Sequence, residues 1–235
     1  MKIARSVIVS FRVVICLLAT PSGIIHAQEY KYEIGGAAGT SFYMGDANRS
    51  QIFLRPGMSG GMMFRYNFNF LWAIKTGVFA AQVSGKSDDS GNSFPFSQQA
   101  SFHRTLVEWG THVEFNFFRY SDKYNYLQTK PYTPYLFTGA GVTYATGNKS
   151  FMGANIPLGI GFKYKVKNRM NIGIEFSMRK LFGDGLDVTE NTSVWNLDNP
   201  YNIESSPLKN KDWYSFTMIF LSWEFRLRKD PCHEK

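Results

Sequence analysis

Apolar residues alternate with polar or small residues along most of the chain after residue 29. The clearest stretch is Thr105–Phe117, in which one set of alternate positions holds Val107, Trp109, Thr111, Val113, Phe115 and Phe117. The positions between them hold Leu106, Glu108, Gly110, His112, Glu114 and Asn116. Because successive side chains of a β-strand point to opposite faces, this pattern predicts a strand with one apolar face and one polar face. No stretch of this region keeps the i, i+3, i+4, i+7 spacing of an amphipathic helix.

The same alternation recurs and predicts an all-β chain of eight strands. Their expected ranges are Tyr30–Tyr43, Gly57–Phe68, Leu71–Ala81, Thr105–Phe117, Tyr132–Thr146, Ile156–Val166, Met170–Lys180 and Trp213–Leu227. Strands of about 9–11 residues are long enough to cross a bilayer when tilted.

The expected connections differ in length. Turns at 67–69 and 167–169 are short, whereas 44–56, 84–103 and 181–212 are long, and 119–131 is intermediate. Short turns at one end and long loops at the other are typical of bacterial outer-membrane barrels. We therefore predict an eight-stranded antiparallel transmembrane β-barrel over residues 28–227, in the outer membrane, with both termini periplasmic.

The alternative is a soluble exported β-sandwich or lipocalin-like barrel with its apolar faces inward. Two features argue against it. The polar faces carry many glycines and charges of both signs, which suits a narrow interior. Aromatic residues also gather near the expected strand ends, as in the girdles of membrane barrels; they are Tyr30, Tyr32, Tyr66, Phe117, Phe118, Tyr144, Trp213 and Trp223.

The N-terminus reads as a secretory signal peptide. Residues 1–27 combine a basic start, a short apolar core and a cleavage site between Ala27 and Gln28. Its removal reduces the net charge from +8 to +5, since three of the 26 basic residues and none of the 18 acidic ones lie in it. Cys232 is then the one remaining cysteine, so no intramolecular disulfide is expected. Residues 228–235 form a short periplasmic tail.

Charged residues of both signs fall on the expected inner faces. An eight-stranded barrel is just wide enough for its inward side chains to fill it, and buried charges need partners. We expect a plugged, ion-paired interior; a proton or ion path through the same charges is the alternative. The expected network consists of Glu33, Arg65, Lys75, Glu108, His112, Glu114, Lys163, Lys165, Glu175, Arg179, Glu224 and Arg226.

Signals for other chemistry are weak. His103, Asp88 and Asp89 share one expected loop, but no nucleophile motif accompanies them, so no catalytic residue is assigned. Cys232 and His233 are adjacent on the tail and do not make a metal site. The sequence predicts no enzyme, cofactor, small-molecule substrate or nucleic-acid partner.

Basic residues gather at the expected periplasmic end. Lys167, Arg169, Arg228 and Lys229, with Arg226 beside them, either flank the strands as ordinary solvated charge or contact a periplasmic partner.

Several strings resemble the PorG-like family of outer-membrane proteins. They run in order through the chain: 32–36 (YEIGG), 41–46 (SFYMGD), 65–69 (RYNFN), 114–117 (EFNF), 132–142 (YTPYLFTGAGV), 156–165 (IPLGIGFKYK), 173–180 (GIEFSMRK) and 212–214 (DWY). The resemblance covers the mature chain. The loops and the tail depart from the family pattern.

This resemblance implies a non-enzymatic subunit of the type IX secretion system of Bacteroidetes. Such a subunit would anchor or organise the periplasmic PorK–PorN ring, so the implied partners are PorK/PorN-like ring proteins and outer-membrane lipid. Two alternatives remain open. One is a general small barrel that supports membrane integrity or adhesion, and the other is a barrel enzyme acting at the loop rim.

Overall fold

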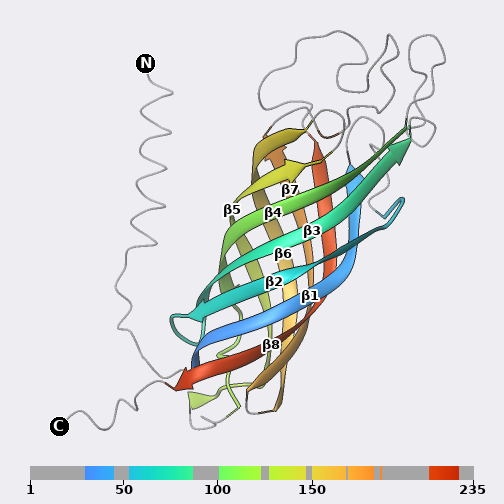
Figure 1. Cartoon of the computed structure of the whole chain (residues 1–235). Coiled ribbons are helices and arrows are strands. Elements are labelled where there is room, and N and C mark those ends of the chain that lie inside the picture. The colour runs from blue at the N-terminus through green and yellow to red at the C-terminus, as the bar shows by residue number, and fades with distance from the viewer. Residues whose placement is uncertain are drawn as a thin grey trace, which may run out of the picture.

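The computed structural model is a closed antiparallel barrel of eight strands, joined in sequence order with β1 beside β8 (Figure 1). It describes residues 30–44, 53–86, 101–122, 127–146, 150–167, 169–182, 186 and 212–227. The predicted fold class is therefore confirmed. The expected signal peptide, its cleavage site at Ala27 and Gln28, and the tail 228–235 lie outside the described residues. The strands are β1 (Tyr30–Met44), β2 (Gly57–Asn67), β3 (Trp72–Lys86), β4 (Ser101–Asn116), β5 (Tyr132–Ala145), β6 (Phe151–Lys167), β7 (Met170–Phe182) and β8 (Trp213–Leu227).

The barrel has a short-turn end and a long-connection end. The short-turn end holds the start of β1, the end of β8 and the β2–β3, β4–β5 and β6–β7 connections. At the β2–β3 turn, the side-chain oxygen of Asn69 accepts hydrogen bonds from the backbone N–H groups of Leu71 (2.8 Å) and Trp72 (2.7 Å). This Asx turn closes the hairpin at the position that the sequence predicts. The four remaining connections lie at the long-connection end.

The middle of the outer wall is apolar. Alternate residues of the strands expose large hydrophobic side chains, including Trp109 (62% exposed), Leu158 (64%) and Ile219 (59%). The residues between them point inward and are buried. Inward glycines make room for large interior side chains: a Cβ added at Gly161 would lie 2.6 Å from the hydroxyl oxygen of Tyr135. An apolar outer wall around a largely polar interior is the reverse of the polarity of a soluble barrel.

β3 and β4 extend further than the alternation predicts, because the pattern inverts towards the long-connection end. There the inward residues Val83, Phe102 and Leu106 are apolar and buried, while Gln82 and His103 are exposed on the outer wall. The expected loop at 84–103 is accordingly shorter, since β3 runs to Lys86 and β4 begins at Ser101.

A hydrophobic core fills this end of the interior. It comprises Tyr43, Ala81, Val83, Phe102, Leu106, Ala145, Leu181 and Leu186, and it continues inward to Tyr214, Phe216, Met218, Phe220, Met63, Phe79, Tyr135 and Phe137. None of the described segments forms a helix long and apolar enough to cross a membrane.

Candidate functional site in the barrel interior

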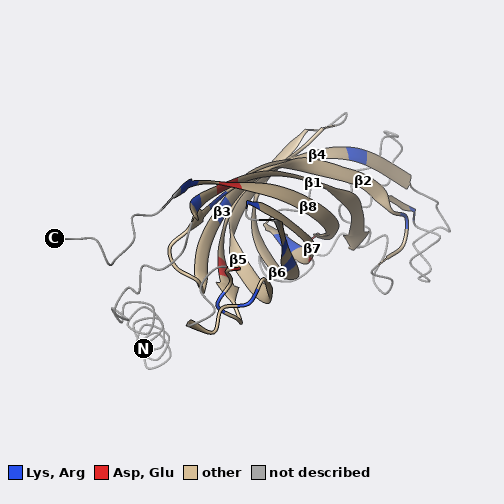
Figure 2. Cartoon of the chain, turned by 90° about the horizontal axis from the view of Figure 1, so that it is seen from below, with Lys and Arg blue, Asp and Glu red and all other residues tan. Residues whose placement is uncertain are grey.

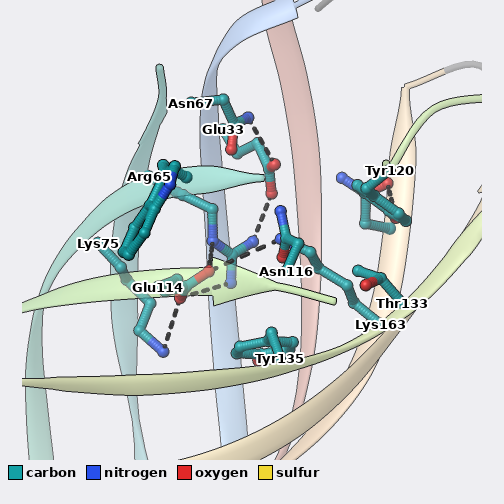
Figure 3. A network of polar contacts seen from close by, with 12 residues as sticks. Glu33, Arg65, Asn67, Lys75, Glu114, Asn116, Tyr120, Thr133, Tyr135 and Lys163 are labelled. Carbon is teal, nitrogen blue, oxygen red and sulfur yellow. Dashed lines mark hydrogen bonds and ion pairs between the residues drawn. The ribbon is translucent and has the colours of Figure 1, made fainter. Parts of the chain in front are cut away.

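Arg65, which points inward from β2, is the centre of the buried charge network. Its Nη1 atom lies 2.5 Å from Oε2 of Glu33, and its Nε atom lies 2.9 Å from Oε2 of Glu114. A third carboxylate, of Glu175, is 3.8 Å away. Figure 3 shows the guanidinium between the carboxylates of Glu33 and Glu114. All four side chains are buried, so the charges neutralise one another away from water.

Two lysines complete this central layer. Lys75 Nζ lies 2.5 Å from Glu175 Oε1 and 3.3 Å from Glu114 Oε1, and it stands 4.4 Å from the centre of the Phe137 ring. Lys163 Nζ lies 3.7 Å from Glu114. The Lys163 ammonium is also within about 5 Å of two aromatic rings, which stabilise a buried cation through their π faces.

A second cluster lies nearer the short-turn end. Lys165 Nζ is 2.8 Å from Glu224 Oε2, and the amide of Asn171 donates to the other oxygen of Glu224 at 2.9 Å. The hydroxyl of Tyr120 donates to Asn171 Oδ1 at 2.7 Å. Lys163 and Lys165 lie on the Tyr120 ring, at 4.9 and 5.5 Å from its centre.

Tyr120 belongs to the β4–β5 connection, not to a strand, yet it is buried. An isolated bridge joins Tyr120 to Lys130 within the connection, and the backbone N–H of Tyr120 donates to the carbonyl oxygen of Phe70 in the β2–β3 turn at 3.4 Å. Burial raises the pKa of the Tyr120 hydroxyl above its ordinary value. Sequence reasoning missed this residue; the one signal for it was the intermediate length of the connection.

A third cluster lies between the central layer and the hydrophobic core. Arg179 Nε is 2.6 Å from Glu108 Oε2, and the hydroxyl of Tyr214 donates to the same oxygen at 2.5 Å. The Arg179 guanidinium stacks 3.9 Å from the centre of the Phe216 ring. His112 is buried 5.4 Å from the Phe137 ring, and neither of its ring nitrogens has a hydrogen-bond partner among the described residues.

The structure brings together all but one of the residues expected in the interior. Buried inside the barrel are Glu33, Arg65, Lys75, Glu108, His112, Glu114, Lys163, Lys165, Glu175, Arg179 and Glu224. Figure 2, a view from below, shows basic and acidic residues on the strands that surround the interior.

Arg226 is the exception, and its predicted place in the interior is wrong. It is exposed, its φ is 61°, and its guanidinium lies 5.7 Å from the centre of the Tyr32 ring. The left-handed backbone at Arg226 interrupts the alternation of β8, so the side chain turns away from the interior.

Other predicted residues lie apart from the interior. His103 lies on β4 with an exposed side chain, not in a loop as expected, and its strand partner is Ser84. Arg169 is exposed in the β6–β7 turn, whereas nothing is described of the Lys167 side chain. Asp88, Asp89, Arg228, Lys229, Cys232 and His233 lie outside the described residues. Within the described ranges, no group of three His, Cys, Asp or Glu side chains could hold a metal ion.

Taken from one end to the other, the interior is filled by side chains of every strand. Ion pairs occupy the middle, an apolar core occupies the long-connection end, and Tyr120 covers the short-turn end. Buried, mutually paired charges hold opposite walls together and leave no carboxylate of the network exposed for chemistry on a substrate.

Comparisons with known proteins identify a family and a distant likeness. Residues 9–234 match the model of the family described as "Domain of unknown function (DUF6089)". No curated protein matches the chain. Among solved structures, the chain is similar to Ail, the attachment invasion locus protein of Yersinia pestis (11% identity, TM-score 0.47, covering 84% of this chain and 100% of that one). It is also similar to Neisserial surface protein A (11% identity, TM-score 0.47, covering 83% of this chain and 97% of that one). A third similar structure is that of the outer membrane protein OprG from Pseudomonas aeruginosa (10% identity, TM-score 0.41, covering 86% of this chain and 98% of that one). Similarities this distant say nothing of function.

Proposed function

We propose that this chain, which belongs to the DUF6089 family, is a small, non-enzymatic outer-membrane barrel with a closed interior. It acts as a structural component of the envelope, in membrane integrity or surface contact, and not as a diffusion pore. One observation carries the proposal: an apolar outer wall surrounds an interior filled by paired charges. That polarity is stable only when the wall faces lipid.

The outer wall supports a membrane location in two ways. Its exposed Leu, Ile, Val and Trp side chains form a continuous apolar surface, far larger than soluble monomers expose. This surface stops where the pattern of β3 and β4 inverts, so the ends of those strands stand in water beyond the bilayer. Outer-membrane barrels keep short turns in the periplasm, which puts the short-turn end, with the start of β1 and the end of β8, on that side.

The closed interior argues against a conducting role. Charges that line a water-filled pore are solvated, whereas the side chains of Arg65 and Glu114 are both 0% exposed. Substituting one partner would leave the others as unpaired buried charges, so the network favours a rigid wall over an ion path.

Several features support a non-enzymatic role. The buried carboxylates are engaged by arginines, lysines and tyrosines, and His103 lies exposed on the outer wall of β4. An active site at the loop rim would need a nucleophile and a base within hydrogen-bond reach of one another.

A second candidate function is that of a type IX secretion subunit. It is supported by the PorG-like strings of the sequence, which run through the chain in order. In this role Lys167, Arg169, Arg228 and Lys229 would contact PorK/PorN-like ring proteins from the periplasmic side. The closed interior suits an anchor of this kind as well as it suits a general structural barrel.

Deletion of the gene in its own bacterium tests the proposal and separates the two candidates. A structural barrel predicts increased sensitivity to detergents and large antibiotics with normal protein export. Loss of cargo export from an otherwise intact envelope would favour the secretion subunit, and co-purification of ring proteins from solubilised outer membrane would support it further. Recovery of the protein in the soluble periplasmic fraction would contradict both.

A further inference from the structure

The exposed charges of the described residues at the short-turn end are nearly all basic. Every described carboxylate except that of Asp122 is buried, and Asp122 lies 3.7 Å from Lys165. By contrast, Arg119, Lys130, Arg169 and Arg226 are exposed at this end. At the short-turn end, the described carboxylates therefore point into the interior, and the exposed charged groups are basic.

Three of these cations, which we call the basic rim, lie on aromatic rings near the ends of the strands. The Arg226 guanidinium is 5.7 Å from the Tyr32 ring centre, and the Arg169 guanidinium is 5.3 Å from that of Tyr30. Arg169 Nε also donates a hydrogen bond to the Tyr30 hydroxyl at 3.2 Å. Lys130 Nζ lies 4.2 Å from the centre of the Phe118 ring. Each contact holds a cation in place while leaving it open to the outside.

The backbone of Arg226 departs from regular strand geometry, and this places its side chain on the Tyr32 ring. In the β1–β8 register, Tyr32 pairs with Phe225 and Tyr30 with Leu227, so Lys31 stands opposite Arg226. A regular strand would turn both cations to the same face, where like charges repel. The φ of 61° costs conformational energy in a non-glycine residue, and it moves the Arg226 guanidinium onto the Tyr32 ring.

The rings of Tyr32 and Phe118, which lie under Arg226 and Lys130, belong to a band of aromatic residues on the outer wall, whereas the Tyr30 ring under Arg169 is buried. Tyr32 contacts the rings of Phe225 (5.6 Å between centres) and Tyr66 (5.3 Å). Further round the barrel, Tyr132 contacts Phe118 (6.0 Å) and Phe162 (6.2 Å). Aromatic bands of membrane barrels lie at the depth of the lipid headgroups, so the rim cations lie at the depth of the phosphates.

We propose that the basic rim, Lys130, Arg169 and Arg226, binds the phosphodiester headgroups of anionic phospholipid in the leaflet around the short-turn end. Guanidinium and ammonium groups are the side chains that recognise phosphate oxygens, and an anionic lipid adds favourable charge. The ring contacts turn Arg226 and Lys130 onto the wall beside the lipid, which favours a headgroup over an acidic protein below the barrel. The inference rests on the proposed outer-membrane location.

The test measures lipid preference of the purified, folded barrel. Native mass spectrometry in detergent compares retention of phosphatidylglycerol with that of phosphatidylcholine of the same acyl chains. Wild-type protein is expected to retain phosphatidylglycerol preferentially. Substituting Lys130, Arg169 or Arg226 by Gln is expected to lower this preference about fivefold for each cation removed. Tyr32→Leu, which removes the ring under Arg226 but keeps an apolar side chain, is expected to lower it less.

Lys180→Gln is the matched control. Lys180 also lies on an aromatic ring, 5.5 Å from the centre of Trp213, but at the long-connection end. This variant is expected to keep the preference of the wild type, and circular dichroism verifies that every variant is folded.

Equal retention of both lipids by the wild type, or an unchanged preference in the triple Gln variant, would overturn the inference. The inference would also be overturned if the Gln substitutions left the lipid preference unchanged and instead abolished binding of an acidic protein. These results can be distinguished from failure of the proposed function. A barrel that inserts into bilayers but shows no lipid preference would refute only the proposed lipid binding by the basic rim.

Discussion

The Nζ atom of Lys75 lies 2.5 Å from Oε1 of Glu175, although the two residues are 100 positions apart in the chain. β3 and β7 stand on opposite sides of the eight-stranded ring, so this ion pair crosses the interior. Both side chains are buried, and Glu175 also accepts a hydrogen bond from the Tyr135 hydroxyl on β5 at 2.5 Å. The pair can form only when the barrel is closed, and it ties opposite walls together.

Substituting Lys75 by Met should lower the free energy of unfolding by about 3–5 kcal/mol, because it leaves Glu175 and Glu114 buried with one cation fewer. Urea unfolding of the protein in lipid vesicles, followed by tryptophan fluorescence, measures the change. Lys180→Met, which removes an ammonium group from the outer wall, should cost less than about 1 kcal/mol. Equal losses in the two variants would show that the Lys75 ammonium is solvated.

The double variant Lys75→Met/Glu175→Leu should lose less stability than the sum of the two single variants. Each single substitution leaves an uncompensated buried charge, whereas the double one removes both partners. We expect a coupling free energy of about 0.5–3 kcal/mol from the double-mutant cycle. Strict additivity would mean that the two side chains do not stabilise one another.

Gly161 faces the interior and Gly36 faces outward, so substituting each by Ala tests which face of the barrel wall is closely packed. A Cβ at Gly161 would lie 2.7 Å from Cε1 of Tyr135, while a Cβ at Gly36 would have the carbonyl oxygen of Gly61, at 3.7 Å, as its neighbour. Gly161→Ala should therefore destabilise the barrel by about 1–3 kcal/mol through overpacking. Gly36→Ala should be tolerated in the same unfolding assay, and the reverse order would contradict the assigned inside and outside.

Tyr120 should control access to the interior from the short-turn end. In a Cys232→Ser background, a cysteine placed at Asn171, the residue to which the Tyr120 hydroxyl donates, should react slowly with a water-soluble thiol reagent. Adding Tyr120→Ala should increase the labelling rate, because the ring that covers this end is lost. Fast labelling before the Tyr120 substitution would show that the β4–β5 connection leaves the interior open.

The period-two alternation predicted the eight strands, because stretches such as Thr105–Phe117 alternate through a whole strand, and the short and long connections between them predicted the barrel. The alternation also put Glu108, Arg179 and Lys75 on inner faces, since position in a strand decides which face a residue joins. The partners could not be predicted, because a pairing such as that of Lys75 with Glu175 depends on the ring closing and on the tilt of the strands.

Three departures have local physical causes. Near the long-connection end the apolar residues, such as Val83 and Phe102, point inward and the polar residues point outward. This is the reverse of the pattern in the rest of β3 and β4, so the sequence predicted a loop where these strands continue. Arg226 leaves its expected face through a left-handed φ that no alternation encodes. Tyr120 lies in a connection, where periodicity carries no information on burial.

Recording from the refolded wild-type protein in a planar lipid bilayer tests the closed, membrane-inserted barrel most directly. Insertion is first verified by protection of the strands from protease. We predict an inserted protein that produces no stable conductance steps, since paired charges and the apolar core fill the interior from one end to the other. Stable, large conductance steps from the inserted protein would contradict the account.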